Sequence, residues 1–168
     1  MSAPATPASL TPGDPDQLRV VLAAHPFCAD LDAAHVHTMA RAASQRSLPR
    51  DAYVLRRGQP ADALGLILEG DVAREIADAG ADTLILETLH AGDPVGWSWL
   101  FPPHRWAFDA RCLTDVEVVH LDAVHLRAMI AADPVFGRDL TQRIGQLVVQ
   151  RLQFTRAQLV GVHRHDRS

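Results

Sequence analysis

The middle of the chain, residues 45–121, consists of short apolar segments separated by turn residues, and this spacing limits the possible folds. Gly, Asp and Pro occur in the turns between the segments. Closely spaced short strands of this kind are typical of antiparallel barrels and sandwiches. About eight strands enclose a core that can hold one small ligand. The predicted strands are Tyr53–Leu55, Leu64–Leu68, Val72–Ile76, Thr83–Leu89, 107–113 and Val116–Leu121.

Helical patterns precede this region. Asp16 is placed to cap a first helix, and Pro26 is expected to interrupt it. A second helix fits residues 27–43, where the apolar residues fall near helical spacing without strand-like alternation. Residues 1–15 carry four prolines among Ser, Thr and Ala, and they are predicted to form a disordered leader.

Helical periodicity returns after the last strand. Asp122 is a suitable N-cap for a short helix. Asp133, followed by Pro134 at the favoured first position, begins a long amphipathic helix that is expected to reach about Leu159. One domain over residues 16–160 is therefore predicted, with helices at 16–43, strands at 45–121, helices at 122–160 and a tail at 161–168.

Composition excludes several classes of protein. The net charge of −4 argues against a nucleic-acid surface, which needs clustered basic residues in excess. No stretch approaches the roughly 20 apolar residues of a membrane span, and the N-terminus lacks the basic and apolar parts of a signal peptide. We therefore expect a cytoplasmic protein that binds neither DNA nor membrane. Two cysteines, Cys28 and Cys112, are too few for a disulfide framework.

The least ordinary stretch is residues 92–111. It contains all three tryptophans, a Pro-Pro pair and two arginines. Gly and Pro interrupt it too often for one strand or one long helix, so a turn, a short helical turn and a loop are expected before the next strand. Large apolar side chains on such a loop are predicted to line or fill a pocket.

Three segments in this order resemble the cyclic-nucleotide-binding domain family, the β-roll sensor of catabolite-activator-type regulators, kinase regulatory subunits and gated channels. Gly58–Gly70 resembles its glycine-bounded strand, and Leu89–Gly96 resembles the start of its phosphate-binding cassette. Val116–Asp122 resembles the last strand and the entry to the hinge helix. The resemblance implies a mainly β fold, a jelly-roll type double-stranded β-helix, with N-terminal helices and a long C-terminal helix.

The resemblance also implies where a ligand would bind. In the family, a glutamate after the cassette glycine holds the ribose, and an arginine further along pairs with the cyclic phosphate. Here Trp97 stands in the place of the glutamate, and Arg105 lies near the position of the arginine. Loss of the carboxylate removes a hydrogen bond of about 1.5–3 kcal/mol. The candidate ligand residues are Gly96, Trp97, Ser98, Trp99, Arg105, Trp106 and Ala107.

Two interpretations of these residues remain open. In one, Arg105 faces an anionic ligand, such as cyclic AMP, cyclic GMP or another small anion, and a tryptophan stacks on it. In the other, Arg105 stacks on a neighbouring tryptophan at the surface, and the tryptophans fill the pocket. The second interpretation predicts an interaction module that binds no ligand.

The long helix is the second candidate for function. In regulators of this family it forms the dimer seam, so the resemblance implies a homodimer or a protein partner. The candidate dimer residues are Leu140, Ile144, Leu147, Val148 and Leu152. The few residues after Val160 are too short for a helix-turn-helix DNA reader.

No catalytic or metal site is predicted. His35 and His37 do not make a usable pair of metal ligands, because residues two apart on a helix point to different faces. No nucleophile–histidine–carboxylate motif, Walker loop or dinucleotide fingerprint occurs. We therefore expect a regulatory or sensor module that needs no cofactor, unless a cyclic nucleotide is its ligand, and not an enzyme.

Overall fold

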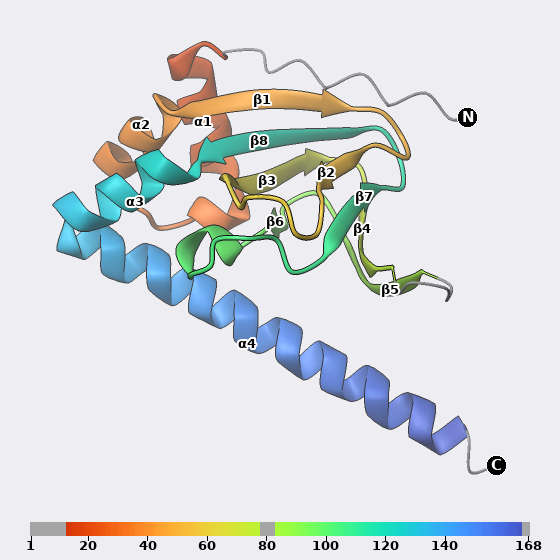
Figure 1. Cartoon of the computed structure of the whole chain (residues 1–168). Coiled ribbons are helices and arrows are strands. Elements are labelled where there is room, and N and C mark those ends of the chain that lie inside the picture. Colours follow the sequence, from red (N-terminus) through yellow and green to blue (C-terminus); the bar gives the residue numbers. More distant parts are fainter. Residues whose placement is uncertain (1–12, 78–82, 166–168) are drawn as a thin grey trace. The chain divides into compact units, whose positions relative to one another are not determined.

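The computed structural model describes residues 13–77 and 83–165 (Figure 1). Its helices are α1 (Pro15–Ala24), η1 (Pro26–Cys28), α2 (Ala33–Ala40), η2 (Ser98–Leu100), α3 (Ala123–Ala132) and α4 (Pro134–His165). Its strands are β1 (Ala43–Leu48), β2 (Tyr53–Leu55), β3 (Ala63–Glu69), β4 (Val72–Ile76), β5 (Leu84–Leu89), β6 (Pro94–Val95), β7 (Asp109–Cys112) and β8 (Val116–Asp122). The chain forms two compact units, Met1–Met129 and Ile130–Ser168, and the first contains every one of these strands.

The strands form two four-stranded sheets. One sheet has the order β1-β8-β3-β6, and the other has the order β2-β7-β4-β5. Each paired neighbour is antiparallel. Consecutive strands therefore often belong to different sheets, which is the connectivity of a jelly roll. The prediction of an antiparallel barrel or sandwich is confirmed.

The predicted strands agree closely with the observed ones, with small shifts at the ends. The sheet region begins at Ala43, because β1 pairs along its whole length with β8, from Ala43 opposite Leu121 to Leu48 opposite Val116. The expected strand 107–113 is shorter and spans Asp109–Cys112. The structure adds β6, since Pro94 and Val95 pair with β3 in a segment that the sequence marks only as a turn.

The N-terminal helices differ from the prediction in two details. Asp14, not Asp16, caps α1, because its carboxylate accepts a hydrogen bond from the amide of Asp16 at 3.0 Å. The expected helix over 27–43 was wrong: the chain forms η1, turns at Asp30 with a φ of 64°, and begins α2 after Asp32. The Asp32 carboxylate caps α2 at 2.7 Å, which local hydrophobic spacing does not predict. Most of the predicted disordered leader, residues 1–12, lies outside the described residues.

The C-terminal helices begin where the sequence predicts. The Asp122 carboxylate accepts from the amide of His125 at 2.7 Å, and that of Asp133 accepts from Val135 at 2.9 Å. The helix α4 continues to His165 and so takes up part of the predicted tail. Among the predicted dimer residues, Val148 is half-buried, Leu152 is exposed, and the remaining three, Leu140, Ile144 and Leu147, are buried. Their role in a dimer stays a prediction.

A buried histidine connects the N-terminal helices to the sheet. His25 is 4% exposed; its Nδ1 accepts from the amide of Phe27, and its Nε2 donates to the carbonyl of Ile67, each at 3.2 Å. Burial lowers the pKa of His25, an effect that the Ile67 carbonyl and Asp93 only partly offset. The imidazole is therefore neutral in the folded protein near pH 7, with its proton on Nε2.

We predict that His25 makes the domain less stable in mild acid. Above pH 6.5 the imidazole is neutral in both the folded and the unfolded chain. As the pH falls below 6.5, the unfolded chain takes up a proton that the folded chain resists, so the free energy of unfolding falls. Urea unfolding at pH 7.5, 6.5 and 5.5 measures this loss, which His25→Gln is expected to reduce. His37→Gln, at an exposed position on α2, is the control, and an equal reduction in both variants would contradict the prediction.

Candidate functional site

The cassette begins where β6 ends. Pro94 and Val95 are held by β3, and Gly96 then turns the chain with a φ of 84°, a conformation that side chains disfavour. The three-residue helix η2 follows, as the sequence predicts for this stretch. The amides of Leu100 and Phe101 bond back to Trp97 and Ser98, so the turn closes on itself.

Trp106 packs directly on Gly96. A Cβ at Gly96 would lie 2.6 Å from Cζ3 of Trp106 and 3.2 Å from Cδ2 of Leu55, which is too close for any side chain. Trp106 itself is only 6% exposed. The glycine is therefore needed for its backbone angle and also because the indole occupies the adjacent space.

The Arg105 side chain bonds to the backbone at the protein surface and not inside the roll. Its Nη1 donates to the carbonyl of Gly58 at 2.7 Å, and the side chain is exposed. The backbone on either side of Arg105 is hydrogen-bonded to the loop that contains Gly58. The amide of Trp106 donates to the carbonyl of Gln59 at 3.0 Å, and the amide of Ala61 donates to the carbonyl of His104 at 2.8 Å. The guanidinium thus closes a loop between β2 and β3. The predicted surface stack on Trp106 or Trp99 is not among the cation–π contacts of the described residues.

Trp97 belongs to a buried aromatic and charged cluster that the sequence analysis missed. The guanidinium carbon of Arg74 lies 5.5 Å from the ring centre of Trp97 and 4.9 Å from that of Phe108. The two rings are 5.6 Å apart and tilted by 52°. Arg74 Nε lies 3.4 Å from a carboxylate oxygen of Glu87, and Arg74 is 7% exposed. A charged residue between Val72 and Ile76, on the alternating apolar face of β4, was the signal that could have revealed it.

The carbonyl of Trp99 ties the cassette to α3. It accepts from Nδ1 of His104 at 3.0 Å and from Nη1 of Arg127 at 2.8 Å. The Trp99 side chain is fully buried, and no hydrogen bond within the described residues reaches its indole nitrogen. Trp99 is thus part of the core and does not offer a free stacking surface.

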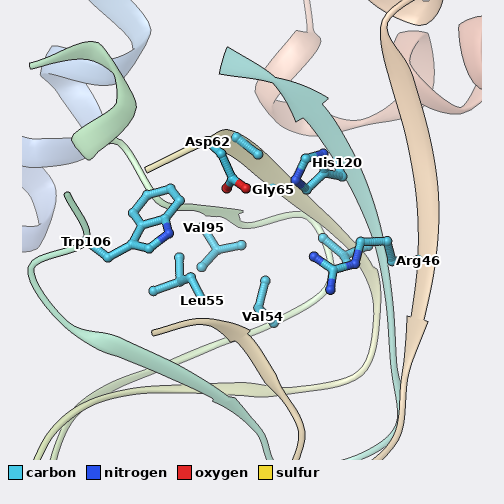
Figure 2. Close-up of a pocket in the computed structure, with 10 residues that line it drawn as sticks. Arg46, Val54, Leu55, Asp62, Gly65, Val95, Trp106 and His120 are labelled. Atoms are coloured by element: carbon cyan, nitrogen blue, oxygen red, sulfur yellow. The ribbon is translucent and has the colours of Figure 1, made fainter. Parts of the chain in front are cut away.

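A small pocket remains inside the roll (Figure 2). Its volume is about 20 Å³, room for about one ordered water. Trp106 and Leu55 form one wall, and Arg46 and His120 face them from β1 and β8. The other lining residues are Val54, Asp62, Ala63, Gly65, Val95 and Val118.

The predicted ligand residues therefore have different surroundings. Trp106 alone among them lines the interior pocket. Trp97 stacks on Arg74, Trp99 is in the core, and Arg105 and Ala107 are exposed. Gly96 seats Trp106, and Ser98 lies half-buried in the short helix. Ligand binding by these residues stays a prediction.

The cysteines and histidines add no reactive centre. Cys28 and Cys112 are buried and not joined to each other, and burial raises the pKa of Cys112 to about 11. A thiol with that pKa carries little thiolate at pH 7. Within the described part of the chain, no group of three or more His, Cys, Asp or Glu is arranged to hold a metal ion. No helix there is long and apolar enough to cross a membrane.

Two antiparallel sheets with a cassette between β6 and β7 and a helix after the last strand define a β-roll binding domain of regulatory type. Comparison with protein families gives the same result, because the cyclic nucleotide-binding domain model matches residues 45–133. The chain therefore belongs to the cyclic nucleotide-binding domain family. The predicted fold and family are both confirmed.

Individual relatives are similar at modest identity. A Rhodopseudomonas palustris protein provisionally assigned as a potassium channel protein is 29% identical over 143 residues, 85% of this chain and 33% of that protein. The cAMP-activated global transcriptional regulator CRP of Salmonella typhimurium is 30% identical over 109 residues, 64% of this chain and 50% of that protein. The crystal structure of a Geobacter metallireducens protein provisionally assigned as cyclic nucleotide-binding superposes with a TM-score of 0.69. It is 27% identical, and the match covers 82% of this chain and 97% of that one.

These matches cover only part of each curated relative, so they establish the domain family and not the activity of a whole protein. The chain spans one third to one half of the length of these curated relatives. At that level, the prediction of a cyclic nucleotide-binding domain with a regulator-like fold is confirmed.

We predict that replacing only one member of the Arg74–Glu87 ion pair lowers the stability of the domain. Arg74→Leu leaves Glu87 without the guanidinium and is expected to lower the free energy of unfolding by about 3–5 kcal/mol. The double variant Arg74→Leu, Glu87→Leu removes both charges and is expected to recover most of that loss. Urea unfolding of the two single variants and the double variant measures the coupling.

The surface pair Arg138–Asp139 provides the control, because Arg138→Leu is expected to change stability by no more than about 0.5 kcal/mol. Additive effects of the Arg74 and Glu87 substitutions would show that the two side chains do not depend on each other.

Proposed function

We propose that this chain is a regulatory domain whose roll interior is closed to cyclic nucleotides by its own side chains, and which acts through its C-terminal helix. The supporting observation is the size of the interior pocket. Its volume of about 20 Å³ is far below the roughly 300 Å³ at which pockets begin to enclose small molecules. Trp106 takes up the space next to the cassette glycine.

The polar residues around the cassette support the same proposal. The position that holds a carboxylate in the family is Trp97, and its ring stacks on Arg74. The candidate phosphate partner, Arg105, is bonded to the Gly58 carbonyl. Without a carboxylate and a cation directed at one space, a cyclic nucleotide lacks the charge-assisted hydrogen bonds that would offset its desolvation.

Internal contacts replace the ligand as the support of the cassette. Arg74 and Phe108 hold Trp97, while Arg127 on α3 holds the Trp99 carbonyl. In this proposal the cassette and the first turns of the hinge helix stay in one arrangement. The domain then serves as an interaction module whose state does not depend on cyclic AMP or cyclic GMP.

The output of the module is assigned to α4. Val149 and Leu152 are 53% and 49% exposed and lie on one face of this helix, because they are three residues apart. Phe154, on another side of the helix, is 47% exposed. Several such residues on one element are typical of an interaction surface. A second copy of this chain is the proposed partner, because the long helix forms the dimer seam in regulators of this family.

We predict that calorimetric titration with cyclic AMP or cyclic GMP produces no binding heat at nucleotide concentrations up to about 1 mM, a limit that excludes micromolar affinity. Arg105→Ala is expected to behave in the same way, because its guanidinium bonds a backbone carbonyl. Circular dichroism confirms that each sample is folded. Micromolar binding that Arg105→Ala removes would overturn the proposal and identify a nucleotide sensor.

We also predict that the wild-type chain sediments as a dimer at tens of micromolar and that Leu152→Glu sediments as a monomer. A carboxylate at Leu152 would have to be desolvated in the interface. Gln153→Glu adds the same charge at the next position and is expected to remain a dimer. A wild-type monomer at about 100 µM, or a Leu152→Glu dimer, would contradict a dimer formed by this face.

A further inference from the structure

The interior pocket is small and mostly apolar, but polar side chains line one side of it. Its ten lining residues include a guanidinium from Arg46, a carboxyl group from Asp62 and an imidazole from His120. Figure 2 shows the Arg46 guanidinium pointing into the pocket from β1, opposite the indole of Trp106. The pocket thus brings together a cation and an indole from elements far apart in the sequence.

One donor of the Arg46 guanidinium has no hydrogen-bond partner within the described residues. Its Nε is buried, and no hydrogen bond from the described residues reaches it. A buried donor of a charged group without an acceptor is costly, and such groups in folded proteins usually bond to a water or an ion. The Arg46 guanidinium points into the adjoining pocket, so an acceptor for its remaining N–H groups can lie there.

The surrounding charges favour an anion in that place. Burial lowers the pKa of His120, with Asp62 acting in the opposite direction and Arg46 in the same one. The imidazole is therefore neutral near pH 7 and still offers one N–H donor. Asp62 is exposed at the edge of the pocket, where water screens its repulsion. Arg46 is then the charge that acts at short range on the interior of the pocket.

The size of the pocket restricts the ligand. A volume of about 20 Å³ holds roughly one water molecule and excludes a phosphate ester or a nucleotide. A monatomic anion has about the dimensions of a water and needs only donors around it. The Arg46 guanidinium, the Trp106 indole nitrogen and the His120 ring supply such donors.

We propose that the pocket beneath Trp106 is a binding site for a halide-sized monovalent anion, held chiefly by Arg46. The bound anion links β1 to Trp106 and so stabilises the closed arrangement of the roll. The site differs from the predicted cassette site, because Arg46, Asp62 and His120 lie outside residues 92–111. Trp106 belongs to both sites, so the inference rests on the closed interior of the proposed function, which the nucleotide titration tests separately.

Thermal unfolding of the full chain tests the site, with sodium chloride compared against sodium gluconate at equal ionic strength and pH 7.5. Gluconate is too large for the pocket and controls for general salt effects. Chloride is expected to raise the unfolding midpoint saturably, by about 3–6 °C at ten times its dissociation constant. Arg46→Gln is expected to abolish the difference between the two salts.

Arg50→Gln is the matched control, because Arg50 follows β1 and is 73% exposed. It is expected to retain the full response to chloride. Equal midpoints in chloride and gluconate for the wild-type chain would overturn the proposal, and so would a normal chloride response in Arg46→Gln. If Arg46→Gln does not fold, crystals of the wild-type chain grown in bromide decide the question. An anomalous peak within hydrogen-bond distance of Arg46 is expected, and its absence would reject the site.

Discussion

The packing of Trp106 on Gly96 is the contact on which the rest of the site depends. In a jelly roll, two sheets close around an interior that side chains must fill or a ligand must occupy. Here the indole enters that interior at the cassette, and the left-handed glycine beside it leaves no room for a side chain of its own. The backbone of Trp106 is hydrogen-bonded to the loop before β3, which fixes the position from which the ring enters the interior. The remaining pocket is therefore small, and the cassette has the support of a packed core.

The polar chemistry of the interior is also rearranged relative to the family. The cassette presents no carboxylate, and its arginine is bonded to a backbone carbonyl. Charged groups instead enter the roll from the strands: Arg74 and Glu87 from one sheet, Arg46 from the other. Arg74 contacts two neighbouring aromatic rings and a carboxylate, so its charge is compensated and its side chain fills space like an apolar residue. In the proposed function, the fold keeps its shape with its own side chains in place of a cyclic nucleotide and leaves only a water-sized space beside Arg46.

Much of the fold was predictable from local patterns. The alternation of apolar residues with Gly, Asp and Pro turns predicted the strands from Tyr53 to Leu121 within a few residues. The Asp122 and Asp133 caps were also predicted correctly, because an N-cap depends on nearest neighbours. The failures have tertiary causes. The helix expected to reach residue 43 ends at Ala40, and Ala43 joins β1, because pairing with β8 across the sheet outweighs local helical spacing. The two-residue strand β6 exists only because β3 lies beside it.

In the candidate site, too, some features follow from the sequence and others only from tertiary structure. The sequence by itself determined the family. It also predicts the position of the cassette and the replacement of its carboxylate by Trp97, because these follow from residue types at fixed spacing. Tertiary structure alone decided which side chains enter the roll. Arg105, the predicted phosphate partner, turns to Gly58, while Arg46, from the first strand of the roll, faces the pocket. Arg74 reaches Trp97 and Phe108 because β4 lies between β5 and β7. The direction of a long charged side chain depends on partners that are distant in sequence, so no local pattern contains it.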